Sequence, residues 1–489
     1  MLVSKIRPLQ RRWQHLWHID DDVKSRLMKS TSWVDGLRGI ATLGVVASHL
    51  VLCFARSLAR PCCGDDRITP KLFQRPVLRL IASGHSWVAV FLVLLGFVNA
   101  LKPIKQLRSG QTDAALNGLN VAAFRRAFRL FLPCTLATSV AWLACQLGLM
   151  ENARTSDAWW LYTNTPPPSP SWSQAIKDLL TALYRTWDFR EGDVIYNQPQ
   201  WTMVFLLEGS MLVFAALLVV ARLTTRWRTM MLSLIALWSM NWSFVIGDPL
   251  VGFTCLGGIM LAEFSLMDAP AKIAQSRWCI LFAGWCWKVG LVLMSVPCDF
   301  PDGAGWSNSL TIFAQRHFPH AASGEIPRAW GSIGAIMLIV GIVLSPHARR
   351  VLSAGPLMWL GKISFPIFLL HPLFMQTVMP IFAFSSEQKY EIHAIPGPLD
   401  TNGVPPVEQI YRFKQRGNIA LLLSIVVTVM CTWGIAHIWT MRIEPIFGKI
   451  TAACEDIMTG RKELTLPKIQ PAQSDGGHTS LTKKEGTLA

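Results

Sequence analysis

Four ionisable side chains lie inside long apolar runs of this 489-residue chain: His49, Glu208, Lys288 and His371. An ionised side chain at mid-bilayer costs roughly 2.5 to 3.5 kcal/mol, so a residue that persists there needs a partner or a function. Counted from the ends of their runs at about 1.5 Å per residue, all four lie roughly 13 to 17 Å deep. They are candidates for one polar cavity. The alternative is that each hydrogen-bonds a neighbouring helix or, for the lysine, snorkels to the surface.

The first apolar run joins a titratable base to a permanent cation. Arg38 and His49 are 11 positions apart, which on a helix leaves them about 20° apart around the axis and about 16 Å apart along it. One stripe thus carries a guanidinium at the mouth of the helix and an imidazole near mid-membrane. Such a pair suits general-base chemistry beside an anion-binding group. Alternatively, Arg38 anchors lipid headgroups beside Asp35.

A second basic cluster, Arg125, Arg126 and Arg129, opens a later apolar run. Arg126 and Arg129 share one helix face, where two guanidinium groups can grip a phosphate bidentately. Anchoring by positive charge at the cytoplasmic surface explains the same residues equally well. The chain has no P-loop, dinucleotide fingerprint, nucleophile elbow or two-histidine metal helix. A membrane-buried base with cations at its mouth therefore suggests a reaction that uses a phosphate-bearing cytoplasmic donor.

The elements that must position these residues are membrane-spanning helices. Ten apolar runs have about the 20 residues that a span needs, or slightly fewer, although nine or eleven spans are also compatible with the sequence. The runs cover about 39–55, 85–101, 130–149, 201–221, 229–246, 249–266, 278–297, 329–345, 363–383 and 418–440. We predict an all-α, polytopic helical bundle.

Composition supports an integral membrane protein. Charged residues make up 16% of the chain and hydrophobic residues 51%, with a mean hydropathy of +0.34, whereas soluble proteins have about 25% charged residues. The net charge of +16 arises from basic residues that flank the apolar runs, so the lipid bilayer, not nucleic acid, is the expected partner. The eleven cysteines lie mostly within the runs without paired metal-ligand spacing, so we predict no metal site.

Charge in the connections indicates the orientation. With a cytoplasmic N-terminus, the inner segments hold 28 Lys and Arg residues and the outer segments 16, which places both termini in the cytoplasm. We expect a cytoplasmic N-terminal segment (1–32), a transmembrane domain (33–445) and a largely disordered cytoplasmic tail (446–489). The outer connections 150–200 and 384–417 are rich in Pro, Trp and polar residues and are candidates to cap the bundle.

Five segments, in order, resemble the membrane acyltransferases of the acyltransferase 3 family, especially its fungal branch. They are Trp33 to Ala41 with Ser48-His49-Leu50; Gly84-His85 to Gly96-Phe97 with Leu101-Lys102-Pro103; Arg125 to Pro133; Gln200-Trp201-Thr202-Met203 with Glu208-Gly209-Ser210; and Leu360 to Phe365 with Leu370-His371. The resemblance implies transfer of an acyl group, expected to be acetyl or another short acyl, from acyl-CoA to a hydroxyl of a carbohydrate, lipid or small-molecule metabolite. It implies no tightly bound cofactor. The expected membrane is the endoplasmic reticulum or plasma membrane.

The resemblance also assigns roles to residues. The family's essential histidine and arginine fall on His49 and Arg38, and its basic third-helix pair falls on Arg126 and Arg129. Three positions depart from the family pattern. In the first two, Leu95 replaces a serine of the second helix, and Leu206 replaces the fourth-helix glutamate. Glu208 lies two positions further along, about 200° around the helix, so it does not inherit that role directly. A valine, Val204, also replaces a proline of this motif.

We therefore expect His49 and Arg38 to be catalytic. Arg126, Arg129 and Arg125 are the expected binding residues for the acyl-CoA phosphates. His371, Glu208 and Trp201 are further cavity candidates, and His371 is expected to line the cavity or to orient His49. The main alternative function is a transporter or flippase for a hydroxylated or acylated metabolite, which, unlike an acyltransferase, needs no thioester.

Overall fold

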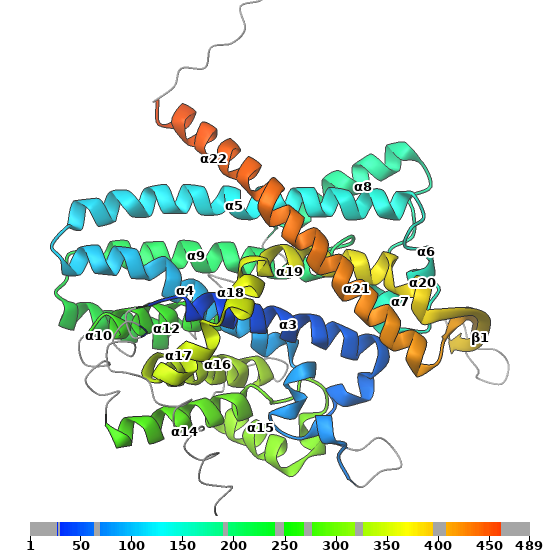
Figure 1. The fold of residues 1–489 in the computed structure, drawn as a ribbon, viewed down its shortest axis with the longest axis horizontal. Helices are drawn as coiled ribbons and strands as arrows, with labels where there is room; N and C mark the ends of the chain where they lie inside the picture. The colour runs from blue at the N-terminus through cyan, green and yellow to red at the C-terminus, as the bar shows by residue number, and fades with distance from the viewer. Residues whose placement is uncertain are drawn as a thin grey trace, which may run out of the picture.

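Apolar runs of this length form helices because backbone polar groups at membrane depth must be satisfied within the protein. A computed structural model describes Leu27 and residues 30–62, 69–188, 194–239, 249–267, 276–317, 326–394 and 407–460. Helices dominate these ranges, and the longest run side by side as one bundle (Figure 1). The chain is thus an α-helical membrane protein, as predicted.

Six of the described helices are long and apolar enough to cross a membrane, or seven if the bent pair α18–α19 counts as one span. They are α3 (Trp33–Phe54), α4 (Gly84–Arg108), α5 (Thr112–Gln146), η4 with α9 (Gln198–Val220), α16 (Ile326–Leu344) and α21 with its continuation (Asn418–Met458). The bent pair is α18 (Gly355–Lys362) and α19 (Ser364–Thr377), and α10 (Thr225–Ser239), α12 (Pro249–Ser265) and α14 (Arg277–Leu293) are shorter.

Each of the ten predicted runs overlaps one of these helices, and residues 240–246 of the fifth run lie outside the described residues. The count of ten spans and the side on which the termini lie stay predictions.

Close packing of α3 against α18 brings two distant parts of the sequence together. A methyl group added at Gly361 would overlap the backbone carbonyl of Asp35, so only glycine allows this approach. The chain then bends by 66° between α18 and α19. This bend places Ser364, the first residue of α19, within hydrogen-bonding distance of Arg38 on α3.

The two long connections between spans meet at one end of the bundle. Residues 150–200 contribute α6 (Glu151–Arg154), α7 (Trp159–Asn164) and α8 (Trp172–Arg185). Within the 384–417 connection, β1 (Phe384–Ala394) and β2 (Val407–Gln415) pair as an antiparallel hairpin, in which Tyr390 faces Tyr411. The backbone of Phe413 pairs with Thr155 and Asp157. This hairpin is the exception to the all-α prediction, and its second strand is held by these backbone hydrogen bonds to the other connection.

Several short elements lie between the spans in the described ranges. They are η1 (Arg56–Ala59), η2 (Leu72–Gln74), η3 (Leu78–Ala82), η5 (Pro301–Gly303), α15 (Gly305–His317), α17 (Pro346–Leu352) and α20 (Met379–Ala383).

The last helix extends beyond the predicted transmembrane domain. After α21 (Asn418–Ile438), the π-helical segment η6 (Trp439–Ile443) leads into α22 (Glu444–Met458), which leans across α5 (Figure 1). Residues 446–458 of the predicted tail are therefore helical. Residues 461–489, and nearly all of the predicted segment 1–32, lie outside the described residues.

Candidate active site

Two histidines from separate helices form a direct hydrogen bond. Nδ1 of His49 on α3 lies 2.8 Å from Nε2 of His371 on α19. The two rings are nearly parallel, with centroids 5.1 Å apart and an interplanar angle of 12°. Both are predicted site residues, and the structure brings them together across 322 positions of sequence.

The surroundings of His371 determine which nitrogen of His49 is available. Nδ1 of His371 lies 3.1 Å from the carbonyl oxygen of Ile367 and 2.9 Å from that of Phe368. A carbonyl only accepts hydrogen bonds, so Nδ1 of a neutral His371 carries the proton and Nε2 accepts. His49 must then donate from Nδ1. Its Nε2 is left with a lone pair, which is the state required of a general base.

His49 faces a cavity of about 400 Å³, which we call the histidine cavity. Trp160 of α7 stacks on the imidazole, with ring centroids 4.8 Å apart and an interplanar angle of 27°. The wall also includes Trp159, Asn164 and Gln198 from the 150–200 connection and Trp201 at the start of α9. The 150–200 connection thus supplies much of the wall around His49, and Trp201, a predicted cavity residue, also lines it.

Two cations also line the histidine cavity, and both are engaged by the protein. Arg79 donates hydrogen bonds to the carbonyls of Ser295 and Ala59, each at 2.6 Å. Burial lowers the pKa of Arg79 to about 10, so this residue remains charged at neutral pH. Arg56 lies 4.0 Å above the ring centroid of Trp159. These contacts indicate that both arginines shape the wall.

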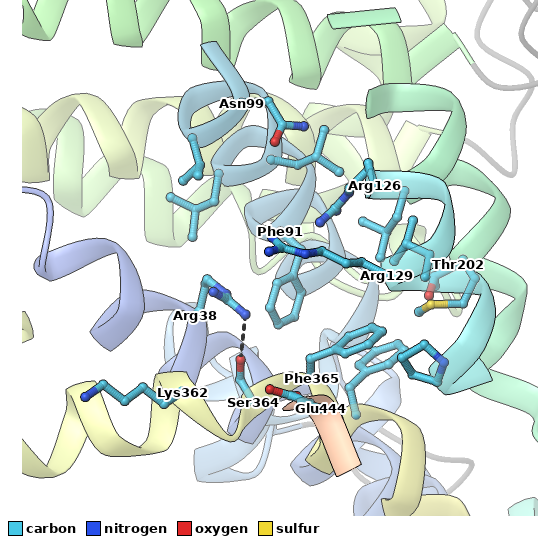
Figure 2. A pocket seen from close by; sticks show the side chains of 18 of the residues that line it. Arg38, Phe91, Asn99, Arg126, Arg129, Thr202, Lys362, Ser364, Phe365 and Glu444 are labelled. Atoms are coloured by element: carbon cyan, nitrogen blue, oxygen red, sulfur yellow. Dashed lines mark hydrogen bonds between the residues drawn. The ribbon is translucent and has the colours of Figure 1, made fainter. Parts of the chain in front are cut away.

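Two of the three predicted phosphate-binding arginines, Arg126 and Arg129, line a second cavity of about 530 Å³ together with Arg38, which was predicted to be catalytic. We call it the arginine cavity. Arg38, Arg126 and Arg129 point into the same space (Figure 2). Arg38 donates to Ser364 at 3.2 Å and lies 3.5 Å from the carboxylate of Asp35. Arg126 is also held by the protein, because its Nε donates a hydrogen bond to Ser210 at 3.1 Å.

Arg129 differs from the other two arginines, because its guanidinium makes no hydrogen bond to any other described residue. An exposed arginine with all its donors unused in a cavity is well suited to bind a phosphate. Lys362 of α18 adds a fourth cation to the wall. The cavity therefore concentrates positive charge that the protein leaves partly uncompensated.

Two polar residues of the arginine cavity were not anticipated from the sequence. Asn99 of α4 has a buried side-chain nitrogen without a hydrogen-bond partner among the described residues. Glu444, the first residue of α22, brings a carboxylate among the cations. The signal for Asn99 was a lone amide inside an apolar run. For Glu444 it was a lone acid just after the last run.

The two cavities adjoin. Val88, Thr202 and Phe368 line both of them, so one side of each residue faces the arginines and another faces His49. These three side chains therefore lie between the arginines and His49 as the wall that the two cavities share. The expected combination of a base and phosphate-binding cations is thus present as two neighbouring compartments.

Other predicted site residues lie elsewhere. Arg125 is absent from the lining of both cavities and makes a bidentate ion pair with Glu455 of α22, at 2.6 and 3.3 Å. Glu208 and Lys288 also line neither cavity, and Lys288 is exposed on α14. Of the four ionisable residues in apolar runs, only His49 and His371 meet.

Two of the three departures from the family pattern face the arginine cavity. Leu95 of α4 and Leu206 of α9 both line it. Where the pattern has a hydroxyl and a carboxylate, this chain has two aliphatic side chains, so this part of the wall is apolar. No group of three or more His, Cys, Asp or Glu side chains suitable for a metal ion occurs in the described residues.

Comparison with known proteins gives a family match over most of the chain. The family described as "Acyltransferase domain" matches residues 31–441. O-acetyltransferase PaAT-1 of Phomopsis amygdali is 26% identical over 391 residues, covering 72% of this chain and 74% of that protein.

Two other fungal relatives are more distant. Acyltransferase clz18 of Cochliobolus lunatus and acyltransferase R4 of a Phoma species are each 21% identical, covering 70% of this chain and 82% of each protein. No solved structure shows significant similarity to the chain. The family match spans most of the sequence and includes Arg38, His49 and His371, and the chain therefore belongs to the acyltransferase 3 family of membrane acyltransferases.

Proposed function

We propose that this acyltransferase transfers a short acyl group from acyl-CoA to a hydroxyl group of an acceptor. The acceptor classes are those expected from the sequence: a carbohydrate, a lipid or a small-molecule metabolite. Acetyl is the preferred acyl group, because one relative is named an O-acetyltransferase. We further propose that the enzyme resides in the endoplasmic reticulum or the plasma membrane.

The observation that carries this proposal is the hydrogen bond between His49 and His371. It leaves Nε2 of His49 as a proton acceptor in a cavity that adjoins a cluster of cations. In the proposed complex the CoA phosphates lie near Arg38, Arg126 and Arg129. The thioester then lies near Val88, Thr202 and Phe368, and the acceptor occupies the histidine cavity.

The chemical step follows from these positions. Nε2 of His49 takes the proton of the acceptor hydroxyl as the oxygen attacks the thioester carbonyl carbon. The tetrahedral oxyanion collapses, and the carbon–sulfur bond breaks. The CoA thiolate leaves and recovers the proton from Nε2 of His49. An ester and free CoA are the products, and the histidine returns to its starting state.

The test compares the purified enzyme with a His49→Ala variant. Loss of a general base typically removes about 10²- to 10⁴-fold of the rate, so release of CoA from acetyl-CoA in the presence of an acceptor should fall by that factor. A matched control is His437→Ala, because His437 is exposed on α21 and lines neither cavity. Undiminished turnover in His49→Ala would disprove the assignment of the base.

The acceptor is sought in the same preparation. Extracts of cells with and without the chain are compared by mass spectrometry for a metabolite that gains one acyl group. A transporter would move its substrate without releasing CoA, so release of CoA also separates the two functions considered for this sequence.

A further inference from the structure

Glu444 lies in an unusual place for a carboxylate, in a cavity that is expected to bind phosphates. It is half-buried, lines the arginine cavity, and lies beside Ser364 and Phe365 (Figure 2). Its charge interacts with those of Arg38 and Arg129. Four cations and one carboxylate thus line the same cavity. The negative charge of the carboxylate offsets part of the positive potential that would otherwise act on a ligand.

The backbone places this carboxylate through a break in helical regularity. Glu444 directly follows the π-helical segment Trp439–Ile443, and an inserted residue of this kind turns everything after it by about 100° around the helix axis. Pro445 has no N–H to donate to the carbonyl of Met441, which favours an irregular turn here. Buried Trp439 packs edge-on against Phe447, with centroids 6.2 Å apart. The orientation of Glu444 is therefore built into the fold.

The same helix carries a second carboxylate that behaves differently. Glu455 is locked to Arg125 by two hydrogen bonds of 2.6 and 3.3 Å. Glu444, in contrast, takes part in no ion pair within 4.0 Å among the described residues. It is near enough to the cations to weaken their field, yet no direct contact holds it against them. Such a carboxylate can give way to an incoming phosphate.

We propose that Glu444 is an internal counter-ion that limits the affinity for the phosphates of CoA and thereby sets the rate at which CoA leaves. This rests on the proposed function, in which those phosphates occupy the arginine cavity. In the empty cavity, the carboxylate offsets part of the charge of Arg38 and Arg129. In the filled cavity, it repels the bound phosphates. Product release, which often limits turnover in enzymes, is faster as a result.

The experiment measures CoA binding to the full-length protein in detergent by calorimetry, and its release by stopped flow. Glu444→Gln keeps the shape and removes the charge, so the Kd for CoA should fall about threefold to tenfold. The KM for acetyl-CoA should fall with it, the release rate should fall by a similar factor, and the affinity should depend more steeply on salt. Glu444→Asp keeps the charge, and its Kd should stay within about twofold of the wild-type value.

The control is Asp113→Asn, which removes the same charge from an exposed position in the first turn of α5, the helix that carries Arg126 and Arg129. Its Kd for CoA should match that of the wild type. An unchanged or higher Kd in Glu444→Gln would overturn the proposal, as would equal effects of the Gln and Asp variants. If the wild-type protein itself neither binds CoA nor releases it from acetyl-CoA, the proposed function fails, and the counter-ion proposal fails with it.

Discussion

Two clusters of arginines in this protein use the same side chain in opposite ways. Arg228 of α10 makes two hydrogen bonds to Glu263 of α12, at 2.9 and 3.1 Å. Both side chains are almost fully buried, and Arg108 of α4 lies 3.8 Å from the same carboxylate. The arginine cavity, by comparison, is open and contains Arg129, whose guanidinium makes no hydrogen bond to a described residue.

The difference lies in how many hydrogen-bonding groups the protein satisfies by itself. In the buried cluster around Glu263, Arg228 also donates to Thr225 and to the carbonyl of Leu223. A group satisfied in this way joins helices and has little left to offer a ligand. An arginine whose donors face a cavity contributes little to the fold but is available to a phosphate.

The two histidines show the same contrast within one hydrogen-bonded pair. His371 is buried and uses both ring nitrogens, one toward backbone carbonyls and the other toward His49. His49 uses Nδ1 toward His371, and its side chain lines a cavity. His371 is therefore a positioning residue, and His49 is the group that can react.

The largest expected effect comes from removing the carboxylate partner of the buried Arg228, and it is a loss of stability. Glu263→Gln leaves the buried charge of Arg228 without its partner, so the free energy of unfolding should fall by about 3 to 5 kcal/mol. Unfolding in detergent, followed by heat or denaturant, measures this change. Glu387→Gln on the hairpin removes a carboxylate whose ion pair with Lys414 is well exposed and should cost less than about 0.5 kcal/mol. Equal losses of stability in the two variants would contradict the distinction between a buried ion pair and an exposed one.

The next effect concerns His371 and falls on the rate. His371→Ala removes the acceptor for Nδ1 of His49, so the tautomer with Nε2 unprotonated is no longer enforced. We expect kcat to fall about 10- to 100-fold, less than for loss of the base itself, while both KM values stay within about twofold. His371→Gln offers a carbonyl oxygen as a new acceptor and should recover part of the loss. If Gln and Ala are equally impaired, His371 does not act through the hydrogen bond.

A smaller effect, on the KM for acetyl-CoA, is expected at the arginine cavity. Arg129→Ala removes one charged partner of the donor phosphates, which is worth about 1.5 to 3 kcal/mol, so the KM for acetyl-CoA should rise about tenfold or more. Stability should not fall, because Arg129 makes no hydrogen bond to another described residue. Initial rates at varied acetyl-CoA, together with a melting curve, test both statements. A lower melting temperature with an unchanged KM would make Arg129 a structural residue.

Hydropathy and local motifs were sufficient to predict the helical membrane fold and to single out His49, His371, Arg126 and Arg129. The runs are visible because burial in lipid demands a nearly continuous apolar segment. The hairpin Phe384–Gln415 was not predicted. Its second strand pairs with Thr155 and Asp157, and contacts so distant in sequence leave no local pattern.

The partners of the site residues could not be predicted for a related reason. Equal depth in the bilayer placed Glu208 and Lys288 beside the histidines, but depth says nothing about which face of a helix turns inward. Glu444 was missed because its direction depends on a π-helical turn that the 3.6-residue period does not contain. Arg125 was predicted to bind phosphate, but its ion pair with Glu455 holds it outside the arginine cavity. A local sequence motif does not show that Arg125 has this partner and Arg126 does not.

Arg125 therefore provides the smallest predicted effect and the sharpest control for the arginine cavity. It is adjacent to Arg126 in sequence, but its side chain is half exposed and paired with Glu455 of α22. Arg125→Ala should change the KM for acetyl-CoA by less than about twofold, because Arg125 lines neither cavity. The same assay used for Arg129→Ala provides the measurement. A donor KM that rises as far in Arg125→Ala as in Arg129→Ala would mean that positive charge at this end of α5, and not the direction in which each side chain points, determines donor binding.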